Sequence, residues 1–185
     1  SLRRQRQMCI RDRTDIYSLY ASEVMLFDDL EAANIGSLQL YLRPLVCLII
    51  AITADKTSHI NLIIFGFITM LIGSLIFALG MVQPNVNMVF YFSLIIVATG
   101  TYAIRALYFS IMQDGLIPLT LTGTAVGLIS VVGYTPDIFA TPAIGYLLDK
   151  YPGITGHQYI FSTLAAFSIL GLIASIKFVN IKNSR

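Results

Sequence analysis

Three charged side chains stand inside long apolar runs of this sequence. Arg43 precedes a proline, Asp137 follows one, and Arg105 lies in the run GTYAIRALY. A charge at the centre of a bilayer costs at least about 2.5 kcal/mol, so such a residue needs a partner or a function. A guanidinium offers paired donors to a carboxylate or phosphate, and a buried carboxyl group can carry a proton. Arg43 and Arg105 are therefore candidates for binding an anion, and Asp137 for coupling to an ion.

Two tyrosines, Tyr41 and Tyr134, could add hydroxyl groups to the same substrate site. Each candidate also has a structural alternative. Arg105 can extend its side chain to the membrane surface, and tyrosines are common at membrane interfaces. Arg43 and Asp137 could instead form a structural ion pair. The sequence leaves these alternatives open.

Apolar residues dominate the composition around these charges. Of the 185 residues, 56% are hydrophobic and 12% are charged, and the mean hydropathy is +0.77. Soluble globular domains carry about twice that share of charged residues. Most charged residues also fall in short gaps between the apolar runs. We therefore expect an all-α polytopic membrane protein.

Five segments are long enough to cross a bilayer, which takes about 20 apolar residues. They cover residues 37–54, 60–81, 88–112, 119–148 and 159–179. Residues 14–27 are moderately apolar and precede an acidic cluster, so they are interpreted as the truncated end of another helix and its exit loop. The sequence thus predicts about five full membrane helices and one partial helix.

The fourth segment contains residues that break helices. They are Gly127, Gly133, Pro136, Pro142 and Gly145. Proline removes a backbone donor, and such breaks survive in lipid only where protein or a wet cavity covers the freed groups. We expect a kinked or locally unwound helix in the interior of the bundle.

Residues 1–13 differ from the rest of the chain. They carry five arginines and one aspartate, so the formal net charge of the chain changes from +2 to −2 without them. The run QRQMCIRDR resembles a translated sequencing adapter, and residues 1–13 are interpreted as a non-native tail before a membrane domain of residues 14–185. A basic cytoplasmic linker is the alternative. With the tail set aside, the net charge indicates no nucleic-acid partner.

Lysine and arginine in the loops predict the orientation of the chain. Cytoplasmic loops of membrane proteins are enriched in these residues. The side reached after the first, third and fifth spans holds four of them, and the other side holds Lys150. These four are Lys56, Lys177, Lys182 and Arg185. The C-terminus is therefore expected in the cytoplasm.

An internal repeat relates the first and fourth spans. Asp55-Lys56 ends the first span and Asp149-Lys150 ends the fourth, three helices later, which gives the two units opposite topology. Arg43 and Asp137 each stand twelve residues before the aspartate of their unit. At 1.5 Å per residue, both lie about 18 Å from their respective surfaces, near the middle of the bilayer. The pattern predicts inverted three-helix repeats.

The order of these motifs resembles the major facilitator superfamily. Residues 100–153 are similar to its tenth and eleventh helices, and Arg105 matches the arginine of its fourth-helix signature and C-terminal counterpart. Asp55-Lys56 resembles its shortened Asp-Arg loop, although Ala51 stands where the family has glycine. The resemblance covers nearly all of residues 14–185. It implies the C-terminal half of such a transporter, from a partial helix seven to helix twelve.

The resemblance implies secondary active transport by alternating access. The solute would be small, organic and anionic, its movement coupled to H⁺ or to an exchanged anion. Its site would lie between this half and an N-terminal half, in a bacterial inner membrane. The alternatives are a channel, an interaction subunit without transport activity, or an inactive fragment.

The sequence contains few features of an enzyme. It contains neither GxSxG nor HExxH, and His59 and His157 are expected in separate loops on opposite faces. Cys47 lies in an apolar run and is interpreted as a small buried hydrophobe. We expect no catalytic residues, no cofactor and no metal site.

Overall fold

The structure is a computed structural model that describes residues 16–84, 86–107, 110 and 121–183, apart from the side chains of residues 132, 136, 137, 182 and 183. Its described elements are all α-helices. They are α2 (Ile16–Glu23), α3 (Asp29–Ala54), α4 (His59–Ala78), α5 (Asn87–Leu107), α7 (Thr122–Lys150) and α8 (Ile154–Asn183). Five of them, α3, α4, α5, α7 and α8, are long and apolar enough to cross a membrane. The chain is an all-α polytopic membrane protein, as predicted.

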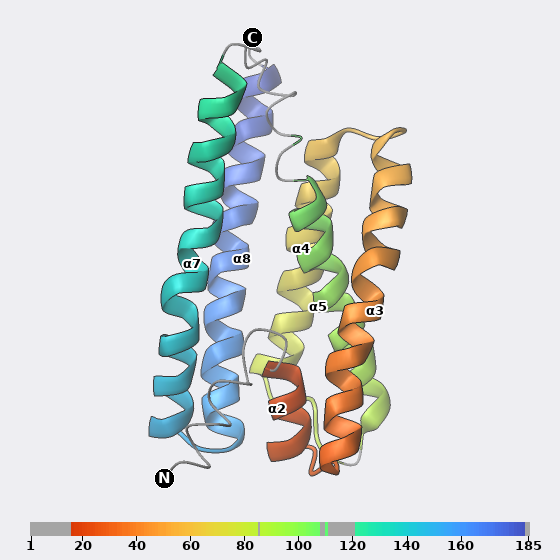
Figure 1. Cartoon of the computed structure of the whole chain (residues 1–185), viewed down its shortest axis with the longest axis vertical. Helices are drawn as coiled ribbons and strands as arrows, with labels where there is room; N and C mark the ends of the chain where they lie inside the picture. The colour runs from red at the N-terminus through yellow and green to blue at the C-terminus, as the bar shows by residue number, and fades with distance from the viewer. Residues whose placement is uncertain (1–15, 85, 108–109, 111–120, 184–185) are drawn as a thin grey trace.

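The five long helices run side by side in one bundle and alternate in direction along the chain (Figure 1). The two ends of each helix therefore lie at opposite ends of the bundle. α2 lies at the lower end of the bundle, beside the start of α3. Each predicted span overlaps one observed helix, with ends that differ by up to eight residues. Residues 108–109 and 111–120, at the predicted junction of the third and fourth spans, lie outside the described residues.

Residues at the helix ends help to set the bounds of α3 and α4. α3 begins at Asp29, eight residues before the predicted span, and carries Asp29 and Glu31 in its first turn. Acidic side chains there favour the helix, since its N-terminus has partial positive charge. The acidic cluster predicted as a loop is therefore mostly helical. α4 ends at Ala78, shortly before Gly80, whose φ of 67° suits a residue without a Cβ.

α4 is the centre of the packing. It has its most extensive contacts with α5 and α8, while α3 packs mainly on α5. Glycines allow the closest approach, since a Cβ on Gly100 of α5 would lie 2.6 Å from the Gly66 carbonyl oxygen of α4. Gly73 faces Val97 in the same way. Small residues at such contacts are the usual means by which membrane helices approach closely.

Aromatic side chains form a core at the lower end of the bundle. Tyr20 of α2 stacks on Phe90 of α5 and meets Phe77 of α4 edge to face, with ring centroids 5.9 and 5.1 Å apart. Phe161 of α8 stacks on Phe77 at 4.4 Å. All four rings are buried. This core joins α2, α4, α5 and α8 in one cluster.

α7 differs from the prediction in two respects. It is continuously helical from Thr122 to Lys150, and none of its most apolar stretch is buried in the bundle. The helix it contacts most is α8. It is therefore neither locally unwound nor in the interior. Prolines need not interrupt a helix in lipid, because no water competes for the backbone hydrogen bonds that remain.

The predicted inverted repeat is visible in helix direction but not in packing. α3 and α7 run in opposite directions (Figure 1). Asp55 and Asp149, at the C-terminal ends of these two helices, therefore lie at opposite ends of the bundle. α3 packs more on α5 and α2 than on the following helix α4, whereas α7 packs most on the following helix α8. The two units are thus packed differently.

Replacing Gly100 by alanine is expected to destabilise the bundle by about 1 to 3 kcal/mol, because the new Cβ would meet Gly66 O, Thr69 Oγ1 and Met70 N within 2.8 Å. Unfolding by SDS in detergent micelles, followed by far-UV circular dichroism, measures this change. Gly123→Ala is the matched control, since a Cβ there meets nothing within 4 Å. Equal stability of the two variants would contradict the close contact between α4 and α5.

Candidate functional site

A cavity of about 270 Å³ lies between α3, α5 and α7. Its walls include Arg43 from α3, Ile104 and Arg105 from α5, and Gly133 and Tyr134 from α7. Three residues predicted for a substrate site, Arg43, Arg105 and Tyr134, thus line one cavity. Their roles in binding stay predictions, but helices distant in sequence bring them together.

Arg43 and Tyr134 lie at similar depths in the bundle, and Arg105 lies nearer its end. Arg43 lies eleven residues before the end of α3, and so about 16 Å in from that end. Tyr134 stands twelve residues after the start of α7, at a similar depth from the same end of the bundle. Arg105 is close to the end of α5. The cavity therefore extends from the upper end of the bundle towards its middle.

Tyr102 connects the cavity wall to the packed part of α3. It lies within electrostatic range of both Arg43 and Arg105. Its hydroxyl donates a hydrogen bond of 3.3 Å to the backbone carbonyl of Gln39, one turn before Arg43 on α3. Gln39 is itself buried. This bond joins α5 to α3 one turn from Arg43.

Two guanidinium groups beside one cavity attract an anion. Arginine is always protonated, and its planar donors match the oxygens of a carboxylate or phosphate. An apolar cavity of about 330 Å³ adjoins this site, because Ile104 lines both cavities. Among the described residues, no cluster of three His, Cys, Asp or Glu could hold a metal ion. The site thus combines two cationic side chains with apolar surroundings.

Other predicted residues lie elsewhere. Tyr41 is 76% exposed and is not among the residues that line the cavity, although it lies on α3 two residues before Arg43. Asp55 and Lys56 follow α3 in its exposed connection to α4. The side chain of Asp137 lies outside the described residues, so its coupling role and its pairing with Arg43 stay predictions.

The predicted helix-break residues all belong to the continuous helix α7. Gly133 lines the cavity. A Cβ on Gly127 or Gly145 would meet nothing within 4 Å, so neither is needed for close packing. Pro142 is exposed, and the side chain of Pro136 lies outside the described residues. Of these residues, Gly133 is the one that the cavity lining includes among those with described side chains.

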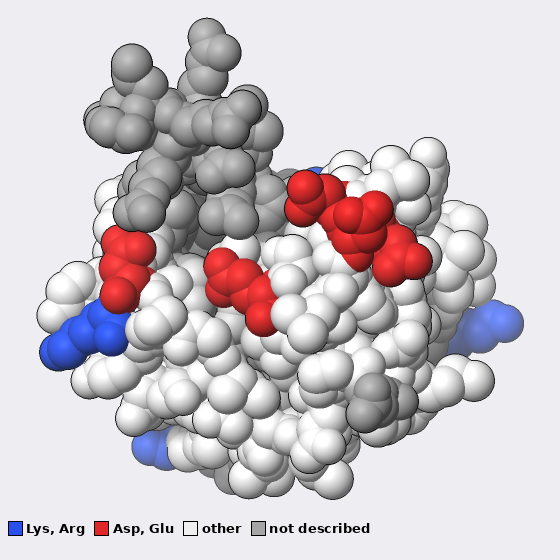
Figure 2. Space-filling view, turned by 90° about the horizontal axis from the view of Figure 1, so that it is seen from below, with Lys and Arg blue, Asp and Glu red and all other residues white. Residues whose placement is uncertain are grey.

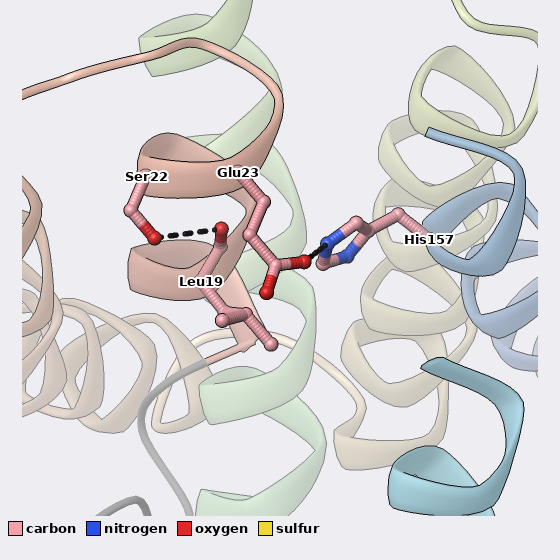
Figure 3. Close-up of polar contacts among 4 residues, drawn as sticks. All are labelled: Leu19, Ser22, Glu23 and His157. Carbon is pink, nitrogen blue, oxygen red and sulfur yellow. Dashed lines mark hydrogen bonds and ion pairs between the residues drawn. The ribbon is translucent and has the colours of Figure 1, made fainter. Parts of the chain in front are cut away.

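A second polar site lies at the lower end of the bundle, and the sequence did not indicate it. His157 belongs to the first turn of α8 and is completely buried, whereas a loop was predicted. Its Nε2 lies 3.1 Å from Oε2 of Glu23 on α2 (Figure 3). The spacing of His157, Phe161, Ala165 and Ser168, all buried on α8, is the helical signal that could have revealed it.

Tyr20 closes the aromatic side of this second site. Its ring meets the His157 ring edge to face, with centroids 5.2 Å apart. Its hydroxyl donates a buried hydrogen bond of 3.0 Å to the carbonyl of Val82. Burial raises the pKa of Tyr20 to about 12, so the hydroxyl keeps its proton and stays a donor at physiological pH.

Acidic side chains gather on the same end of the bundle. Figure 2 views the molecule from below and shows several red patches on this end. The helix termini located there carry Glu23, Asp28, Asp29, Glu31 and Asp149, with Lys150 beside Asp149. Glu23 is 39% exposed. The His157–Glu23 pair therefore joins an acidic, exposed surface to a buried imidazole.

The fold defines an integral membrane protein, and comparison with known proteins agrees. Over 75 residues the chain is 36% identical to Inner membrane protein YihN of Escherichia coli, and over 78 residues it is 32% identical to Inner membrane protein YqcE of the same organism. These matches cover 40% and 42% of the chain, and 18% of each relative. No family model and no solved structure matches.

These findings correct the expected membership of the major facilitator superfamily. No family model matches, and the two relatives have names that state a membrane location without a transport class. The motifs that suggested the family are isolated arginines, a short Asp-Lys turn and a glycine-proline series. Such features serve membrane helices in general, since small residues aid packing and basic residues mark cytoplasmic loops. The expectation of a C-terminal major facilitator half is therefore wrong.

Tyr20→Phe is expected to destabilise the chain by about 1 to 2 kcal/mol, because the buried carbonyl of Val82 loses its donor. The midpoint of SDS unfolding in micelles would report the loss. Tyr41→Phe removes the same atom from an exposed ring and should leave the midpoint unchanged. If Tyr20→Phe also leaves it unchanged, the hydrogen bond between α2 and the α4–α5 connection does not support the fold.

Proposed function

We propose that the chain takes part in transporting a small organic anion across the inner membrane of a bacterium. The observation that carries this proposal is the shared cavity of Arg43, Arg105 and Tyr134 between three membrane helices. Charged residues in membrane segments are rare and mark the paths of ions and substrates. The relatives named as inner membrane proteins support the location.

The solute class follows from the chemistry of the cavity. Arg43 and Arg105 would bind a carboxylate or phosphate through paired hydrogen bonds, and the Tyr134 hydroxyl would offer a further donor or acceptor. A volume of about 270 Å³ is near the lower end of the usual range for ligand sites, which favours a small molecule. The adjoining apolar cavity would receive carbon-rich parts of the solute.

Transport, rather than static binding, requires that the site face each side of the membrane in turn. The loose packing of α7 supports this step, because α7 forms one wall of the cavity and none of its most apolar stretch is buried. We propose alternating access, an accompanying H⁺ or exchanged anion, and a cytoplasmic C-terminus as parts of the same function. An enzymatic role forms no part of the proposal. The matched segment is 18% of each relative, so the activity of the whole protein is included in this proposal.

Uptake by the protein in its full length, reconstituted in proteoliposomes, tests the function. Radiolabelled glucuronate and glucose 6-phosphate are the probes, and glucose is the neutral comparison. Arg43→Gln and Arg105→Gln are each expected to weaken anion binding about tenfold or more, since a hydrogen bond to a charged group contributes about 1.5 to 3 kcal/mol.

Lys56→Gln is the matched control, because it removes a cation in an exposed connection away from the cavity. It should leave uptake unchanged. An equal loss in Lys56→Gln would mean that general surface charge attracts the anion. Anion binding without uptake would contradict transport, and equal uptake of glucose would contradict selection by the arginines.

A further inference from the structure

His157 is a buried ionisable residue that the proposed anion site does not use. It is completely buried in the first turn of α8, and its Nδ1 has no hydrogen-bond partner among the described residues. Buried polar atoms in proteins nearly always have a partner, so an exception needs an explanation. A histidine held for structure alone would normally have both nitrogens satisfied.

Glu23 connects this imidazole to the outside. Its Oε2 lies 3.1 Å from Nε2 of His157, and the side chain is 39% exposed at the acidic end of the bundle (Figures 2 and 3). Glu23 belongs to α2 and His157 to α8, and the two residues are 134 positions apart in sequence. Glu23 therefore contacts both solvent and the buried ring.

The other groups around His157 leave Glu23 as its charged neighbour among the described residues. Tyr20 of α2 presents its ring at 5.2 Å, and its hydroxyl is engaged with Val82. Phe161, one turn along α8, and Phe77 of α4 complete the aromatic cluster and carry no charge. Within this aromatic enclosure, the Glu23 carboxylate is the group that would stabilise a protonated ring.

We propose that His157 and Glu23 form a proton-binding site at the acidic end of the bundle. In the unprotonated pair, the neutral ring carries its hydrogen on Nε2 and donates it to the Glu23 carboxylate, which leaves Nδ1 as the vacant acceptor. A proton from solvent hydronium adds to Nδ1, where the new N–H bond forms as an O–H bond of hydronium breaks. The product is an imidazolium whose Nε2–H faces the carboxylate. Use of this proton to drive anion transport rests on the proposed function, whereas the proton site itself does not.

Titration of His157 by ¹⁵N NMR, with the full chain in lipid nanodiscs, tests the proposal. The chain has two histidines, so a His59→Gln background leaves one imidazole to observe. We expect the ring signals to change as the pH is lowered from about 8 to about 4, a range that extends below the usual one for histidine because burial disfavours the charged ring. Signals that stay constant over this range would overturn the proposal and make the pair a structural hydrogen bond.

Glu23→Gln is expected to move the midpoint lower by about one pH unit, because the carboxylate that favours the charged ring is lost. Glu31→Gln is the matched control, since it removes an exposed acid at the same end. An equal shift in both variants would show a general surface effect and overturn the role of Glu23. If Glu23→Gln fails to fold, the titration of the unmutated pair still decides whether His157 binds a proton. Failure of anion uptake would leave this titration unaffected.

Discussion

Close contact between α4 and its two neighbours determines where every other helix lies. Glycines let α5 approach α4 until backbone atoms meet, and Gly171 of α8 lies against the Phe67 ring of α4. α3 is then attached mainly through α5, and α7 mainly through α8. Because α3 and α7 depend on different neighbours of α4, they do not fill the space between them. The cavity with Arg43 and Arg105 occupies that space.

This arrangement explains how the bundle tolerates two arginines. A guanidinium facing lipid at mid-depth would be expensive, whereas one that faces a cavity can keep water or an anion beside it. The short separation of Arg105 from the end of α5 lowers its cost further, since its side chain can reach the membrane surface. Arg43 lies deeper and has less access to either surface. Of the two, Arg43 therefore has the stronger requirement for an anionic partner.

The sequence was sufficient for the helices and for part of the site. Hydropathy predicted the five spans, because lipid requires continuous apolar segments whatever their neighbours are. The type and depth of Arg43 made it a candidate for a substrate site or a structural ion pair, and Arg43 lines the cavity between α3, α5 and α7. Packing partners could not be predicted in the same way, since lipid and protein contacts favour similar side chains. The interior position predicted for α7 failed for this reason, and Tyr41 was assigned to a cavity that its side chain does not line.

The His157–Glu23 pair was missed because neither residue is unusual in sequence. Each lies near the end of a helix, where a charged residue normally meets solvent, and the pair exists only because α2 folds against α8. α8 is also the main neighbour of α7, which carries Tyr134 to the cavity. Arg43 and Arg105 are held by α3 and α5 instead. α8 is therefore the helix that contacts both α2, which carries Glu23, and α7, which forms one wall of the cavity.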